Sequence, residues 1–419
     1  MKIKKTILKS GITVLTEKFT QIPSFALSYT LKSGSRNEII NTSGIHHLME
    51  HMLFKGTKKY SVKDIAYISD RLGGRLNAFT SKEITQFYIK AIDEKLDQAF
   101  DLLTNIIFSS NFEKSEFKKE VEVILQEIRE GDDNPDSKAF ELFYEKLFPE
   151  NGVGLPIAGT IQSVSALSRD LVHDTYTKLY SPENLILSYV GNVEHSRIVE
   201  FTEKHLSNIN FNKNSIHDVV KPSFNKNIFV QRNKNLKQIY SIIGLPGISV
   251  VNPDRYKFMI MNDILGAGMS SRLFQNIREQ RGLAYTISSF VDSFQDFGLH
   301  IIYSILEPGK IDEYLKTVKN EIEVLKTEGV TSEELDKSKD HIKSSLILSL
   351  ENNISKMRLN VNQELYFKKQ KKINEIIDEV NRVTINDIKE TANKFMDLNN
   401  VSVLLYGDLP ETKDYSFNV

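Results

Sequence analysis

The stretch with the strongest chemical signal is residues 44–54, which read Gly44-Ile45-His46-His47-Leu48-Met49-Glu50-His51-Met52-Leu53-Phe54. The apolar residues of this stretch have helical spacing. On a helix, positions i and i+4 lie on one face, so His47 and His51 can present two imidazoles to one metal ion. Glu50 lies near that face, where its carboxylate can reach a water molecule instead of the metal. The stretch therefore predicts a helix with two metal ligands and a candidate general base.

Zinc is the metal that these residue types favour. The chain has no Cys, so any metal must be held by His and carboxylates. Zinc accepts neutral His nitrogens and a carboxylate oxygen in a tetrahedral shell with one open position, and residues 47–51 are the inverted form of the zincin motif. The alternative is a pair of His on an ordinary helix face. The apolar residues 52–54 count against it, because they continue a face that would bury the helix, and a buried His needs a partner.

A third ligand must come from another part of the chain. An amphipathic helix predicted over residues 113–130 offers Glu120 and Glu127, which are seven residues apart and so two turns along one face. The apolar residues around them indicate a partly buried helix, in which an unpaired carboxylate would be costly. Spacing alone does not choose between the two.

Residues 44–57 closely resemble the signature of the pitrilysin family of zinc metallopeptidases, and above all the branch that contains the mitochondrial processing peptidase β subunit and its bacterial relatives. In that family the third ligand is a Glu that follows the second His by 76 residues, and 127 − 51 = 76. The resemblance thus implies one zinc ion per chain, held by His47, His51 and Glu127, with Glu120 supporting the ligands. Asn77, Ala78 and Phe79 match the edge strand that binds the substrate in this family.

The second part of the chain carries further matching segments. Residues 268–274 and 278–285 resemble the family's Arg/Tyr segment, in which an Arg and a Tyr seven residues apart approach the zinc; here these are Arg278 and Tyr285. The second half has no counterpart of the His pair, which is usual for the family. The segment 266–268 is short, unlike the long glycine-rich loop of the processing peptidase α subunit, so the chain resembles the catalytic partner.

Length and element order predict two similar halves. The chain has 419 residues, about three times the length of a typical single domain. Strands and helices predicted in the second half repeat the order of the first, which indicates an internal duplication. We expect an α+β fold in which each half is a mostly antiparallel sheet with helices packed on it. The halves are predicted at 1–210 and 228–419, joined around an enclosed cleft by a polar linker at 211–227 that is also compatible with an ordinary surface loop.

Charge and hydropathy exclude several classes of partner. Lys and Arg number 54 and Asp and Glu 55, so the net charge is −1 and gives no bulk reason to bind nucleic acid or an anionic membrane. The apolar runs are far shorter than a membrane span, and the N-terminus lacks the apolar core of a signal peptide. We therefore expect a cytoplasmic protein without membrane insertion.

The resemblance implies a zinc metalloendopeptidase that cleaves short or unfolded peptides, including presequence-like ones, alone, as a homodimer or with a related subunit. Glu50 would act as the general base, Tyr285 would stabilise the developing oxyanion, and Arg278 would hold a substrate carbonyl. Two alternatives are a non-catalytic assembly subunit and a peptide-binding module of the same fold.

Overall fold

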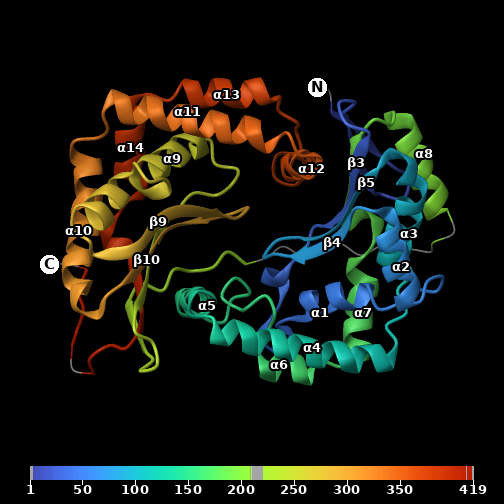
Figure 1. The fold of residues 1–419 in the computed structure, drawn as a ribbon, viewed down its shortest axis with the longest axis horizontal. Helices are drawn as coiled ribbons and strands as arrows, with labels where there is room; N and C mark the ends of the chain where they lie inside the picture. Colours follow the sequence, from blue (N-terminus) through green and yellow to red (C-terminus); the bar gives the residue numbers. More distant parts are fainter. Residues whose placement is uncertain (1–2, 208, 210–219, 412, 418–419) are drawn as a thin grey trace. The chain divides into compact units, whose positions relative to one another are not determined.

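The computed structural model describes residues 3–207, 209, 220–411 and 413–417, and these form two compact units (Figure 1). Unit 1 contains residues 1–131, 150–220 and 349–370, and unit 2 contains residues 132–149, 221–348 and 371–419. Each unit has one sheet with helices on both faces. The predicted α+β fold is confirmed.

The sheet of unit 1 has the strand order β1-β2-β6-β3-β5-β4, and only the β2–β6 pair is parallel among the described residues. Its strands are β1 (Ile3–Ile7), β2 (Thr13–Lys18), β3 (Ser24–Leu31), β4 (Arg75–Thr80), β5 (Thr85–Ile92) and β6 (Leu185–Gly191). β4 is an edge strand, so one side of its backbone has no strand partner in the described chain.

Helices of unit 1 pack on both faces of this sheet. The helices are α1 (Ile45–Leu53), α2 (Val62–Leu72), α3 (Leu96–Phe108), α4 (Lys114–Asp133), α6 (Ile161–Ala166), α7 (Arg169–Leu179), α8 (His195–Leu206) and α12 (Asn353–Asn362). Alternate residues of β3 show the division, since Phe25 and Leu27 point into a core shared with α1 and α3, whereas Ala26 packs with Met357 of α12. The sheet therefore has an α1 face and an α12 face.

The sheet of unit 2 has the strand order β7-β11-β8-β10-β9, with only β7–β11 parallel among the described residues. Its strands are β7 (Ile228–Arg232), β8 (Ile239–Pro246), β9 (Ala284–Ser293), β10 (Gly298–Leu306) and β11 (Ser402–Gly407). Its helices are α5 (Pro135–Leu147), α9 (Arg255–Asn262), α10 (Ile311–Thr327), α11 (Ser332–Ser349), α13 (Ile373–Asn381) and α14 (Ile385–Phe395). The order repeats β2-β6-β3-β5-β4 of unit 1 strand for strand, so the predicted duplication is confirmed.

The units exchange one helix each, which the sequence did not indicate. α5 comes from the first half of the chain but packs on β8 and β11, and α12 comes from the second half but packs on β6, β3 and β2. Gly244 of β8 makes room for α5, because a Cβ there would lie 2.4 Å from Cζ of the fully buried Phe143. The predicted boundaries of 1–210, 211–227 and 228–419 stay a prediction, and residues 211–219 of the predicted linker lie outside the described residues.

None of the described helices combines the length and the apolar character needed to cross a lipid bilayer.

Candidate metal centre

The two His of the quoted stretch lie on α1 and face Glu127 of α4. Ile45, Leu48, Met49, Met52 and Leu53 of α1 are buried, which turns positions 47 and 51 away from the core. Oε2 of Glu127 lies 3.9 Å from Nε2 of His47 and 3.7 Å from Nε2 of His51. All three ligand atoms lie within 4.8 Å of one another. These separations exceed a hydrogen bond and are about twice a zinc–ligand bond of roughly 2.1 Å.

Glu120 contacts the ring of His51 at Nδ1, the nitrogen that does not face Glu127. Its Oε2 lies 3.1 Å from Nδ1 of His51, and its Oε1 accepts a 2.8 Å bond from the ammonium of Lys55. Because a carboxylate accepts, Nδ1 of His51 carries the proton, and Nε2 is left with a free lone pair toward Glu127. Burial tends to raise the pKa of Glu120, but hydrogen bonds from His51 and Lys55 outweigh it and lower that pKa. Glu120 therefore stays ionised and orients a ligand.

The residues fit a zinc ion in their donor chemistry, and His47 also fits it in its protonation. Burial, and then the charge of His51, lower the pKa of His47 to about 4, so its imidazole is neutral near pH 7. Neither ring nitrogen of His47 makes a hydrogen bond within the described chain, and its Nδ1 is buried. For His51, burial lowers the pKa, but the hydrogen bond to Glu120 and the nearby carboxylates raise it more. Two nitrogens and one oxygen converge as a zinc site requires.

Glu50 lies one residue before His51 and contacts the edge strand rather than the metal ligands. Its Oε2 accepts a 2.5 Å hydrogen bond from the hydroxyl of Thr80, the last residue of β4. Burial, and more weakly the charge of Glu127, raise the pKa of Glu50, while the Thr80 bond and His51 lower it less. A carboxyl group with a raised pKa holds a proton more readily, as a general base requires.

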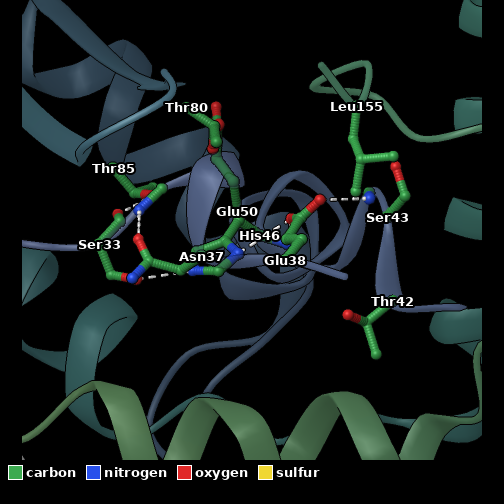
Figure 2. Close-up of polar contacts among 12 residues, drawn as sticks. Ser33, Asn37, Glu38, Thr42, Ser43, His46, Glu50, Thr80, Thr85 and Leu155 are labelled. Atoms are coloured by element: carbon green, nitrogen blue, oxygen red, sulfur yellow. Dashed lines mark hydrogen bonds and ion pairs between the residues drawn. The ribbon is translucent and has the colours of Figure 1, made fainter. Parts of the chain in front are cut away.

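A buried carboxylate holds the N-terminus of α1 (Figure 2). Oε2 of Glu38 accepts from the backbone N–H of Gly44, and its Oε1 accepts from the backbone N–H of His46 and from the ring Nδ1–H of His46, all at 2.8–2.9 Å. Nε2 of His46 lies 2.9 Å from the hydroxyl oxygen of Ser33. Gly44 has φ +90°, and a Cβ there would lie 2.6 Å from the carbonyl oxygen of Ala158. The sequence assigned no role to Glu38, since nothing in its spacing points to α1.

The predicted substrate residues lie on the exposed edge of the unit 1 sheet. Asn77 and Phe79 point to the α12 face, where Phe79 packs near Tyr88, while Ala78 packs against the core on the α1 face. Oδ1 of Asn77 accepts the backbone N–H of Ala78 at 2.9 Å. That amide therefore points away from β5 and is available at the edge.

Arg278 and Tyr285 lie together in unit 2. Arg278 is on a π-helix over Phe274–Glu279, and its guanidinium carbon lies 5.4 Å from the ring centre of Tyr285. Tyr285 is 73 % exposed and lies on the edge strand β9. The register of β9 with β10 skips from Thr286 to Ala284, so Tyr285 sits at a β-bulge. Bulges and π-helices both re-aim side chains and are frequent near functional sites.

Comparison with known proteins gives consistent results along the chain. Residues 13–161 match the family model described as "Insulinase (Peptidase family M16)", and residues 166–342 match the one described as "Peptidase M16 inactive domain". A Bacillus subtilis protein named as an uncharacterized zinc protease is 35 % identical over 93 % of this chain and 95 % of its own length. The chain belongs to peptidase family M16.

Solved structures agree with this M16 assignment at the level of the fold. A protease from Helicobacter pylori has a TM-score of 0.91 at 23 % identity and covers 97 % of this chain and 99 % of its own. A chain of complex III2 from Candida albicans has a TM-score of 0.85 at 19 % identity and covers 99 % of this chain and 98 % of its own. The predicted family is therefore confirmed, since the pitrilysin and insulinase names denote one family of zinc peptidases. The M16 inactive-domain model falls on the part of the chain that lacks the His pair.

Proposed function

We propose that the chain is a zinc-dependent endopeptidase that cleaves short or unfolded peptides. The observation that carries the proposal is the convergence of His47, His51 and Glu127 beside Glu50. The names of the related zinc proteases support it.

His47, His51 and Glu127 would hold the ion, and Glu120 would keep the ring of His51 in the ligating tautomer. Zinc bound in such a site acts as a Lewis acid that activates water and the substrate carbonyl. The remaining chemistry belongs to the side chains of this chain.

Glu50 would take a proton from the attacking water and deliver it to the leaving amine. Its raised pKa suits both steps, because the carboxylate must bind the proton and then release it. The hydrogen bond from Thr80 restricts the rotation of Glu50 and ties the base to the strand that would carry the substrate.

A peptide would add to the open edge of β4 as an extended strand. Its carbonyl would replace Oδ1 of Asn77 as the acceptor for the N–H of Ala78, so the edge amide is satisfied both before and after binding. Backbone pairing of this kind tolerates many side chains, which suits an enzyme for unfolded peptides.

Arg278 and Tyr285 would act on the substrate from unit 2. Tyr285 would donate a hydrogen bond to the developing oxyanion, and Arg278 would hold a substrate carbonyl. Their stacking, the bulge and the exposure of Tyr285 support roles in contact with a substrate.

The test combines metal content with turnover. The purified chain should contain one zinc ion by elemental analysis, cleave a quenched fluorescent peptide, lose cleavage with a chelator and regain it with zinc. Glu50→Gln should keep the zinc and lose about 10²-fold or more of the rate. Glu122→Gln is the matched control, because Glu122 is exposed on α4 and, among the described residues, makes no hydrogen bond or ion pair with any of the three proposed ligands His47, His51 and Glu127. Full activity in Glu50→Gln would remove it from the reaction, and zinc binding without cleavage would favour an assembly subunit or a peptide-binding module.

A further inference from the structure

Three cationic side chains gather on the α12 face of unit 1, beside the edge strand β4. Arg75 begins β4 and pairs in register with Lys90 of β5, so the two point to the same side of the sheet. Arg358 extends from α12, and its guanidinium carbon lies 4.9 Å from the ring centre of Phe79 and 5.4 Å from that of Tyr88. Arg75 and Arg358 are exposed, and Lys90 is half-buried.

No carboxylate of the described residues pairs with this cationic group. None of Arg75, Lys90 and Arg358 makes an ion pair within the described parts of the chain, although many other Lys and Arg residues do. Like charges directly opposite on a sheet repel each other. The net charge of the whole chain is −1, so the local excess of positive charge is a feature of the α12 face and not of the chain as a whole.

α12 holds Arg358 in a fixed place. Met357 is fully buried against the sheet, and Asn360 and Lys356 bond to the buried Glu17 of β2 at 3.0 and 3.5 Å. Arg358 itself is exposed and contacts Phe79 of β4. A cation on such a rigid helix loses little freedom when it binds an anion.

We propose that Arg358, Arg75 and Lys90 form a subsite that selects peptides with a carboxylate side chain near the cleaved bond. This inference rests on the proposed function and deepens it. In a peptide added to β4, alternate side chains would point to the α12 face, opposite the positions of Phe79, Asn77 and Arg75. Thr80 donates a hydrogen bond to Glu50, the proposed base. It lies one to five residues from these positions, which is up to about 16 Å along a strand. An Asp or Glu within about five residues of the cleaved bond would therefore reach the cations.

The experiment compares peptides that differ only in charge. A neutral quenched peptide cleaved by the wild-type chain is the scaffold, and single positions up to five residues on either side of the bond carry Gln, Glu or Lys. Each cation at an exposed site contributes roughly a two- to fivefold factor, so Glu should be preferred over Gln about tenfold in kcat/KM at one or more alternating positions. The preference should shrink at high salt, because the subsite is exposed.

Two variants test the subsite: the single variant Arg358→Gln, and a triple variant that combines Arg358→Gln, Arg75→Gln and Lys90→Gln. The Glu/Gln ratio should fall stepwise toward one, with zinc content and thermal unfolding retained. The matched control is Arg71→Gln, because Arg71 of α2 is also exposed and lies 5.8 Å from the ring centre of Tyr67, but belongs to a helix on the other side of the sheet. A ratio near one in the wild type, or an unchanged ratio in the triple variant, would overturn the subsite and leave the peptidase intact. Failure of the wild type to cleave any peptide would instead overturn the proposed function and the subsite with it.

Discussion

Replacing Glu38 by Gln should loosen the N-terminus of α1, the helix that carries His47 and His51. The carboxylate of Glu38 is fully buried and accepts three hydrogen bonds, two from backbone N–H groups of α1 and one from the ring of His46. A Gln offers one acceptor oxygen, so at least one donor loses its partner and the remaining bonds lose their charge assistance. Hydrogen bonds to charged groups contribute about 1.5–3 kcal/mol each, so we expect a loss of about 3 kcal/mol in the free energy of unfolding.

The assay is calorimetry of the zinc-free protein. For a unit of roughly 200 residues, 1 kcal/mol shifts the Tm by about 2–4 °C, so the unfolding of unit 1 should move down by about 6–12 °C. His46→Ala should cost less, since it leaves both backbone bonds to Glu38 in place. The double variant should be less destabilised than the sum of the two, by about 1 kcal/mol, because the two residues share a bond. A shift below about 2 °C for Glu38→Gln, with exposed Glu122→Gln as the reference, would refute the role of Glu38.

Three further changes test other parts of the structure. Glu120→Gln should weaken zinc binding about 10- to 100-fold in a competition titration, because the carboxylate that orients His51 is lost. The control Glu122→Gln should bind zinc as tightly as the wild type, and equal zinc affinities of the two variants would argue against that role of Glu120. Gly244→Ala should lower the free energy of unfolding by about 1–3 kcal/mol, because the added methyl group clashes with the ring of Phe143. Adding Phe143→Leu to this variant should restore part of the loss in thermal unfolding, and no recovery would mean that the clash is elsewhere. Burial lowers the pKa of His300 to about 4, so the native state holds this imidazole neutral while the unfolded chain protonates near pH 6.5. Stability should thus fall by about 3 kcal/mol between pH 6.5 and 4 relative to His300→Gln in denaturant titrations, and parallel pH profiles would contradict this.

Local patterns predicted the elements that hold the site. The helix within residues 44–54 and the amphipathic helix at 113–130 follow from apolar spacing, and both are present, as Ile45–Leu53 and Lys114–Asp133. Glu127 could not be chosen over Glu120 on spacing, because both lie on one side of α4. The structure separates them by burial, since the Glu120 side chain is 5 % exposed and that of Glu127 is 43 % exposed.

Long-range contacts could not be read from the sequence. Glu38 lies between two short 3-10 helices and bonds to α1 beyond them, and α5 and α12 each pack on the sheet of the other half of the chain. Their amphipathic patterns predict a buried face but do not name the sheet that buries it. The contact of Arg358 with Phe79 depends on that exchange, so the cationic group beside β4 is a consequence of tertiary packing alone.

The corresponding helices of the two units carry different polar groups. α9 is the first α-helix after β8, as α1 is the first after β3, but it contains no His and ends at Asn262. Oδ1 of Asn262 accepts from the hydroxyl of buried Ser289 at 2.8 Å and lies 2.9 Å from Nε2 of buried His300. In this group a neutral amide oxygen accepts from its neighbours, whereas the ligand atoms of His47, His51 and Glu127 lie within 4.8 Å of one another without a hydrogen bond between them. The same topology therefore supports a buried polar network in unit 2 and a candidate metal centre in unit 1.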